Sequence, residues 1–273
     1  MDHLKRVEDE FTRQAETFSA YASIAGGDVI ARFQENIGEA ATGTLLDVAC
    51  GPGAVSAALA LKAESVTAFD ATSAMLDKAR ERCEAAGLVN VKFEQGAAEK
   101  MPFADGAFDG AVTRLALHHF VDPTVVLKEV QRVLRPGGVL VIADVVVSED
   151  AAEADLQNAI EILRDPSHIR MLPLTELNAA VEGSGFKIES GTVWDKDREF
   201  EEWMGIVNDP QRLNPLRTVA RALAEESRHA GMGLSIEDGQ LVFFHRWVVI
   251  SATKSAGVTP FRDWGPPADP SLP

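Results

Sequence analysis

Two adjacent histidines and one aspartate are the residues best suited to proton transfer. His118 and His119 follow the predicted strand Asp109–Ala116, and Asp144 is embedded in the apolar run Val139–Val147. A neutral imidazole can accept a proton from a hydroxyl group. A carboxylate in an apolar strand is costly without a partner, so we expect Asp144 to orient a histidine. The three residues predict general base catalysis on a hydroxyl or phenol.

Structural roles are the alternatives for these residues. Neighbouring side chains at the end of a strand point in opposite directions, so we expect only one of the two histidines to face the cleft. The other histidine would pack or cap, and Asp144 could simply accept a backbone N–H. Residues Arg164–His168 could form a third polar wall, although capping of the next turn is the favoured role there. His229 and His245 lack companions and are expected to be structural.

Ligand-type residues end three successive predicted strands. Gly51 and Gly53 follow the strand Thr44–Ala49, where they let the backbone approach a ligand, and a helix with free N–H groups comes next. Asp70 ends the second strand, where a carboxylate can accept hydrogen bonds from ribose hydroxyls. Gly96 ends the third strand, where an adenine ring would lie. Together they predict a nucleotide site.

The residues around the glycine turn discriminate between nucleotides. The dinucleotide fingerprint needs a third small residue where this chain has Ser56. Asp47 stands just before the turn, where its charge would oppose a pyrophosphate. A carboxylate there suits the ammonium group of S-adenosylmethionine, so this methyl donor is favoured over NAD.

Alternating apolar and amphipathic runs indicate a parallel sheet flanked by helices. The chain between the last two strands, residues 195–235, is predicted to be mostly helical and to cover the open end of the sheet. The predicted strands are Thr44–Ala49, Ser65–Asp70, Val91–Gly96, Asp109–Ala116, Val139–Val147, Phe186–Trp194 and Leu241–Ala252.

Four ordered motifs carry a family resemblance. The runs LLDVACGPG, AFDATSAML, GAAEKMPFADGAFD and LALHHFVDPTVVLKEVQRVLRPGGVLVIAD are similar to class I S-adenosylmethionine-dependent methyltransferases. The nearest group is the ubiquinone/menaquinone C-methyltransferase-like set, which includes many small-molecule O-methyltransferases. The resemblance implies an α/β, Rossmann-like fold with a seven-stranded sheet in the order 3-2-1-4-5-7-6, the last strand antiparallel, helices on both faces and a helical cap.

The resemblance also implies a set of donor-binding residues. Ala49 replaces a glycine usual in the first motif, and Ala97 stands where many relatives have an aspartate that binds the adenine amine. Glu99, Gln95 or a backbone carbonyl could replace that contact. Tyr21 would reach the donor from an N-terminal helix that acts as a lid. The full set is Asp47, Ala49, Gly51, Gly53, Asp70, Ala71, Met75, Gly96, Ala97, Ala98, Glu99 and Tyr21.

Composition restricts partners and organisation. The formal net charge of −16 argues against nucleic acid as a partner. Two cysteines exclude a disulfide framework, and no apolar run is long enough to span a membrane, so a cytoplasmic protein is expected. No cluster has metal-ligand spacing, and a homodimer is left open. We expect one methyltransferase domain over 1–255, with a helical lid at 1–40, an acceptor cap at 195–235 and a proline-rich tail at 256–273.

These features predict methyl transfer to a small acceptor, by O- or C-methylation of a phenol, quinol, sugar or polyketide-like hydroxyl compound. His118, His119 and Asp144 would assist by deprotonating it. One alternative is an enzyme of this fold that binds the donor but performs a non-methyl reaction such as cyclisation. A second is a ligand-sensing or scaffold protein, because fold alone is a weak guide to function.

Overall fold

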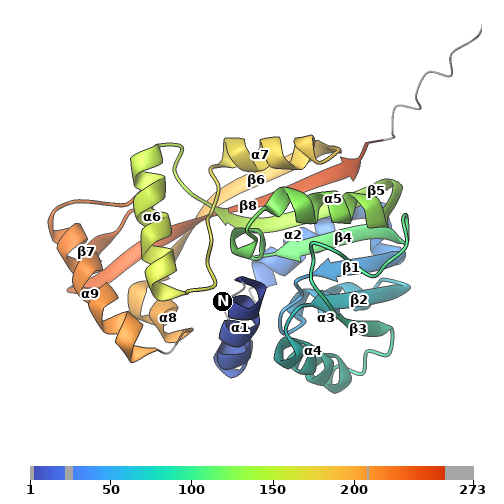
Figure 1. Cartoon of the computed structure of the whole chain (residues 1–273), viewed down its shortest axis with the longest axis horizontal. Coiled ribbons are helices and arrows are strands. Elements are labelled where there is room, and N and C mark those ends of the chain that lie inside the picture. Colours follow the sequence, from blue (N-terminus) through green and yellow to red (C-terminus); the bar gives the residue numbers. More distant parts are fainter. Residues whose placement is uncertain (1–2, 22–26, 208, 256–273) are drawn as a thin grey trace, which may run out of the picture.

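Apolar strands and amphipathic helices alternate along the chain and build one twisted sheet with helices on both faces (Figure 1). The computed structural model describes residues 3–21, 27–207 and 209–255. The strands are β1 (Thr44–Val48), β2 (Ser65–Asp70), β3 (Val91–Gln95), β4 (Phe108–Arg114), β5 (Leu134–Val146), β6 (Phe186–Glu199), β7 (Ser235–Glu237) and β8 (Gln240–Lys254).

Helices connect and cover these strands. They are α1 (His3–Ala20), α2 (Gly27–Asn36), α3 (Ala54–Ala60), α4 (Ser73–Ala85), α5 (Pro123–Val133), α6 (Ala151–Arg164), α7 (Leu174–Gly183), α8 (Phe200–Gly205) and α9 (Pro210–Glu225), with 3₁₀ helices η1 (Gly38–Thr42) and η2 (Leu117–His119).

The strand order β3-β2-β1-β4-β5-β8-β6 confirms the predicted topology. Neighbours from β3 to β5 are parallel, whereas β8 is antiparallel to both β5 and β6. The one addition is the short β7, which pairs with β8. Strand β5 lies centrally, and its residues 140–143 are fully buried, as expected for a strand covered on both faces.

The predicted helical stretch 195–235 is wrong at both ends. Strand β6 continues to Glu199, and β7 occupies Ser235–Glu237 just before β8. The extension is stable because β6 and β8 stay in register, with Trp194 opposite Trp247 and Arg198 opposite Phe243. Figure 1 shows these two long strands reaching beyond the rest of the sheet toward α6, α8 and α9.

A separate apolar cluster holds that projecting end together. Its largest side chains include Phe200, Trp203 and Phe243, with Met204 and Leu213 packed around them. Helix α6 packs against α9, and α8 and α9 contact β8, so the projecting strands are covered on this side. This arrangement places side chains of β6, β8 and α6 around one space.

The N-terminal helix α1 packs against α4, near the carboxyl ends of β1 and β2. The predicted tail at 256–273 lies outside the described residues. In the portion of the chain that the structure describes, none of the helices combines the length and the apolar character needed to cross a bilayer.

Candidate active site

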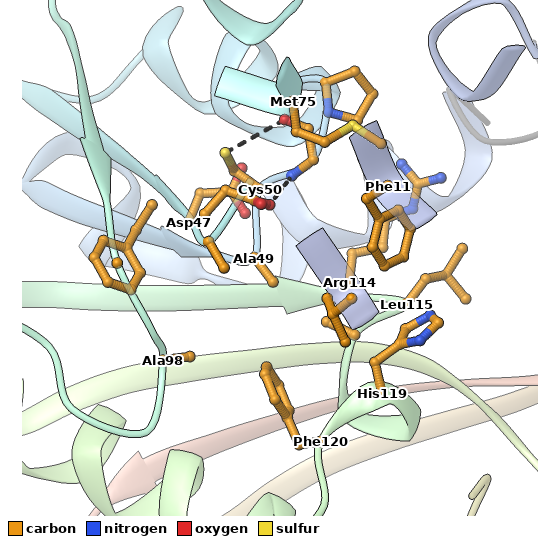
Figure 2. A pocket seen from close by; sticks show the side chains of 18 of the residues that line it. Phe11, Asp47, Ala49, Cys50, Met75, Ala98, Arg114, Leu115, His119 and Phe120 are labelled. Atoms are coloured by element: carbon orange, nitrogen blue, oxygen red, sulfur yellow. Dashed lines mark hydrogen bonds between the residues drawn. The ribbon is translucent and has the colours of Figure 1, made fainter. Parts of the chain in front are cut away.

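Two adjoining cavities lie at the carboxyl ends of the central strands. The larger, of about 1020 Å³, lies between the β1–α3 turn, the ends of β2 and β4, and α1 (Figure 2). The smaller, of about 680 Å³, lies between α1, α6, β6, β8 and η2. Four residues line both cavities: Phe11, Phe18, Leu115 and His119. A molecule in one cavity can therefore meet a molecule in the other at this shared wall.

The β1–α3 turn opens the larger cavity by its backbone conformation. Ala49, Gly51 and Gly53 all have positive φ angles, of 54°, 52° and 73°. A Cβ atom at Gly53 would lie 2.6 Å from the Cβ of Ala79, so only glycine lets α3 and α4 approach each other this closely. At Gly51 a Cβ would meet nothing within 4 Å, because that face of the turn borders the cavity.

Asp70 ties the turn to the end of β2. One carboxylate oxygen accepts a hydrogen bond from the Gly51 amide at 2.9 Å, and the other accepts one from the Thr72 amide at 2.8 Å. Burial raises the pKa of Asp70, and these two hydrogen bonds partly offset that effect. The carboxylate lines the larger cavity, so its remaining lone pairs are available to a diol.

Asp47 is a second acid in the larger cavity, and only 1% of it is exposed. The Ser56 hydroxyl donates a hydrogen bond to its carboxylate at 2.5 Å. Burial raises the pKa of Asp47 to about 7 despite this hydrogen bond. Ser56 thus supports Asp47 rather than serving as the third small residue of a dinucleotide turn. A carboxylate at this depth favours a ligand with a positive group.

The remaining wall suits an apolar, planar group. Phe69, Ala71 and Met75 line it, together with Gly96, Ala98 and Glu99. Three residues of the predicted donor set, Gly53, Ala97 and Tyr21, do not line either cavity. Gly53 faces Ala79 of α4, and the Tyr21 hydroxyl lies against Gly205 of α8. The Gln95 side chain donates to the Ala71 carbonyl at 2.8 Å, so its amide N–H is already engaged.

Helix α1 closes the cavity with residues that sequence reasoning missed. His3, Leu4 and Val7 join Phe11 and Phe18 in the lining. The His3 ring donates a hydrogen bond to the His119 carbonyl at 2.8 Å and so joins α1 to η2. The available signal was the spacing of 4, 7, 11 and 18, which places these apolar side chains on one helical face.

His118 and Asp144 form a buried hydrogen-bonded pair. The His118 Nδ1 lies 2.7 Å from an Asp144 oxygen. The Leu117 and Val145 amides also donate to this carboxylate, at 2.9 and 2.8 Å. Burial alone would lower the pKa of His118, but the charge and hydrogen bond of Asp144 outweigh it, so this pKa is raised. The pKa of Asp144 is lowered by the same pairing, against its own burial.

The expectation that only one histidine faces the cleft is wrong. Both rings line the smaller cavity, with their centroids 4.3 Å apart. The reason is local, because the chain turns into the 3₁₀ helix η2 at Leu117 and the alternation of a strand no longer applies. The pair therefore offers two imidazoles to the same space.

His119 differs from His118 in its surroundings. Its Nδ1 lies 3.1 Å from the Ser167 carbonyl oxygen, to which it donates, and this leaves Nε2 as an acceptor. Burial, followed by the neighbouring His118, lowers the pKa of His119 to about 4. His119 is therefore a neutral hydrogen-bond acceptor at the shared wall of the two cavities. Figure 2 shows it in the lining of the larger cavity.

The smaller cavity is also lined by charged and polar residues for which the sequence analysis expected structural roles. Arg164, Asp165 and His168 line it, although Asp165 also caps its own turn through Ser167. His245 is not without a companion, because its Nε2 lies 3.0 Å from a Glu161 oxygen. Among the described residues no group of three or more His, Cys, Asp or Glu side chains has the geometry to hold a metal ion.

Comparisons with known proteins agree on one family. Residues 46–142 match the family described as Methyltransferase domain. The chain is similar to a solved candidate methyltransferase of Bacillus halodurans, with 31% identity, a TM-score of 0.78, and coverage of 84% of this chain and 100% of that one. It is 28% identical to YcgJ of Bacillus subtilis, called an uncharacterized methyltransferase, over 87% of this chain and 94% of that protein.

The solved YcgJ structure has a TM-score of 0.76 at 25% identity and covers 84% of this chain and 99% of that one. A demethylmenaquinone methyltransferase of Clavibacter sepedonicus is 40% identical over 37% of this chain and 40% of that protein.

Proposed function

Because the chain belongs to the class I S-adenosylmethionine-dependent methyltransferase family, we propose that it methylates a small organic hydroxyl compound bound in the smaller cavity. The observation that carries the proposal is the shared wall. Phe11, Phe18, Leu115 and His119 separate a nucleotide-type cavity from a second cavity that holds a histidine–aspartate pair. Donor and acceptor would meet at this wall, where alignment of the reacting atoms supplies most of the catalysis.

The methyl donor is S-adenosylmethionine, and the larger cavity fits it. Asp47 would bind the ammonium group, Asp70 the ribose hydroxyls, and the apolar wall around Met75 the adenine. The turn residues Ala49 and Gly51, which line this cavity, would let the backbone approach the donor. When bound, the donor would supply its methyl group, which would bond to the acceptor oxygen or carbon as the methyl–sulfur bond breaks and S-adenosylhomocysteine leaves.

His118 is the proposed general base. Its Nδ1–H donates to Asp144, which leaves Nε2 free to remove the acceptor proton, and the Asp144 charge stabilises the imidazolium that results. His119 would hold the acceptor hydroxyl through its unprotonated Nε2, at the wall that faces the donor. The same base would serve O-methylation of a phenol and C-methylation of a quinol.

The test incubates the protein with S-adenosylmethionine and a panel of phenols, quinols and sugars. The formation of S-adenosylhomocysteine is measured. We expect turnover with at least one acceptor and a fall of about 10²- to 10⁴-fold in kcat for His118→Gln. His229→Gln is the matched control, because His229 contacts the Leu234 carbonyl and lines neither cavity. Product formed without S-adenosylhomocysteine would instead indicate cyclisation or another non-methyl reaction, and equal rates for the two variants would contradict the role of His118.

A further inference from the structure

The smaller cavity contains an arginine whose guanidinium is only partly hydrogen-bonded within the described residues. Arg198, near the end of β6, lines this cavity and is only 9% exposed. Its Nε and Nη2 atoms are buried and have no hydrogen-bond partner among the residues that the structure describes. A buried guanidinium without partners is unfavourable, so such a group is usually kept for something that binds it.

Nearby acids do not satisfy Arg198. Glu161 lies in the same cavity, but one of its oxygens accepts from His245 at 3.0 Å and the other faces Arg164 at 3.5 Å. Glu202 attracts the guanidinium electrostatically, yet Nε and Nη2 have no hydrogen-bond partner in the part of the chain that the structure describes. Burial lowers the pKa of Arg198, yet the ordinary value for arginine is so high that the group stays charged.

Arg164, in the same cavity, has partners for its guanidinium group. Its Nε donates to the Trp203 carbonyl at 3.2 Å, and its guanidinium stacks over the Trp203 ring at 4.5 Å. Its Nη1 also faces Glu161. Arg164 is thus held in the protein framework, whereas Arg198 retains an unused edge.

That edge has a definite chemical preference. Nε and Nη2 lie along the same edge of the planar guanidinium and can donate two parallel hydrogen bonds to the two oxygens of a carboxylate. We infer that the acceptor carries a carboxylate group, bound by this edge of Arg198. The inference rests on the proposed function, because it takes the smaller cavity as the acceptor site.

The positions of Arg198 and His119 define the rest of the acceptor. His119 lies at the wall shared with the larger cavity, whereas Arg198 lines only the smaller one. The methylated hydroxyl therefore lies at one end of the acceptor and the carboxylate at another. Trp203, Ile206 and Trp247 supply apolar surface to the same cavity, and the indole N–H of Trp247 has no partner among the described residues. An aromatic hydroxy acid has this combination of groups.

The experiment compares acids with their neutral esters. Hydroxybenzoic and hydroxycinnamic acids and their methyl esters are titrated into the full chain with S-adenosylhomocysteine present, by calorimetry, and the same compounds are then assayed for methyl transfer. Since hydrogen bonds to charged groups are the stronger kind, we expect at least one acid to bind about 10- to 100-fold more tightly than its ester. Arg198→Met should remove that preference without changing ester binding, and Arg198→Lys should restore part of it.

Two measurements separate binding from folding. Arg198→Met should not lower Tm, because it removes an unpaired buried charge. Arg246→Met is the matched control, since Arg246 forms an exposed ion pair with Asp195 and lines neither cavity. It should keep the preference for acids.

The inference is overturned if no acid binds more tightly than its ester, or if Arg198→Met retains the preference. Methylation of neutral phenols without any preference for acids would overturn it and leave the proposed function standing. Failure of every acid and ester to yield S-adenosylhomocysteine would count against the proposed function itself, and calorimetry would still decide whether Arg198 binds carboxylates.

Discussion

Replacing Asp144 with asparagine tests the proposed base without changing the size of the side chain. The carboxylate accepts three hydrogen bonds, from the His118 ring and from the Leu117 and Val145 amides. An asparagine keeps one acceptor oxygen and places an NH₂ group where the other oxygen was. If the NH₂ group faces Leu117, a buried amide loses its partner. If it faces His118, the ring must change tautomer, so that Nε2 carries the proton and cannot accept another.

The magnitudes follow from these contacts. A buried donor left without a partner costs about 1–3 kcal/mol, so Asp144→Asn should unfold at a lower temperature than the wild-type protein. General base catalysis contributes about 10²- to 10⁴-fold, and kcat should fall by that factor. Asp144 does not line the larger cavity, so the Kd for S-adenosylhomocysteine should stay the same.

The assay is a pH profile of kcat/KM in both proteins. Because Asp144 raises the pKa of His118 above 6.5, wild-type kcat/KM should rise with pH and level off only above that value. Without the charge, burial dominates, and the profile of the residual activity should move to lower pH. The raised pKa also stabilises the folded state. This contribution is complete below pH 6.5 and is lost as pH rises through the folded-state pKa of His118. A wild-type rate in Asp144→Asn, or an unshifted profile, would refute the assignment.

Three further predictions concern the larger cavity and its turn. Asp70→Ala should weaken S-adenosylhomocysteine binding by about tenfold or more in calorimetry, because it removes the carboxylate expected to bind ribose and two hydrogen bonds that hold the loops. The pKa of Asp47 is raised to about 7, so binding of an ammonium group should release protons at pH 7, and the affinity should increase as pH rises. Calorimetry in buffers with different heats of ionisation measures this proton release, and Asp47→Asn should abolish it. Gly53→Ala should destabilise the fold by about 1–3 kcal/mol or more in thermal unfolding, since its Cβ would lie 2.6 Å from that of Ala79 at a φ of 73°. Gly87→Ala, with a φ of 68° and nothing within 4 Å, should cost only the backbone strain. Equal losses for the two glycine variants would contradict the steric argument.

The sheet and its nucleotide end could be predicted because their signals are local. The family resemblance implied the strand order. The glycine turn, Asp47 and Asp70 each stand within a few residues of a strand end. Parallel strands bring their carboxyl ends to one edge, so residues far apart in the chain meet there without further information. The placement of these residues along one cavity is what that rule leads us to expect.

The second cavity could not be predicted because its contacts are distant in sequence. Glu161 and His245 are 84 residues apart, and neither carries a motif. Arg198 was assigned to a helical insertion, yet it lies on a strand whose register with β8 turns its side chain toward the cavity. The orientation of both histidines depends on one turn of 3₁₀ helix, which the pattern of apolar residues does not indicate.

The division between the cavities also explains why relatives identify the donor more readily than the acceptor. Of the 24 residues that line the larger cavity, 19 lie within the family-matched segment 46–142, the exceptions being residues 3, 4, 7, 11 and 18. Of the 16 that line the smaller cavity, only Leu115, His118 and His119 do. The shared segment thus supplies the donor site and the two histidines, whereas α1, α6, β6, α8 and β8 shape the acceptor site. Acceptor specificity must therefore be inferred from this chain's own side chains, and the unpartnered Nε and Nη2 of Arg198 are the most specific feature among the described residues.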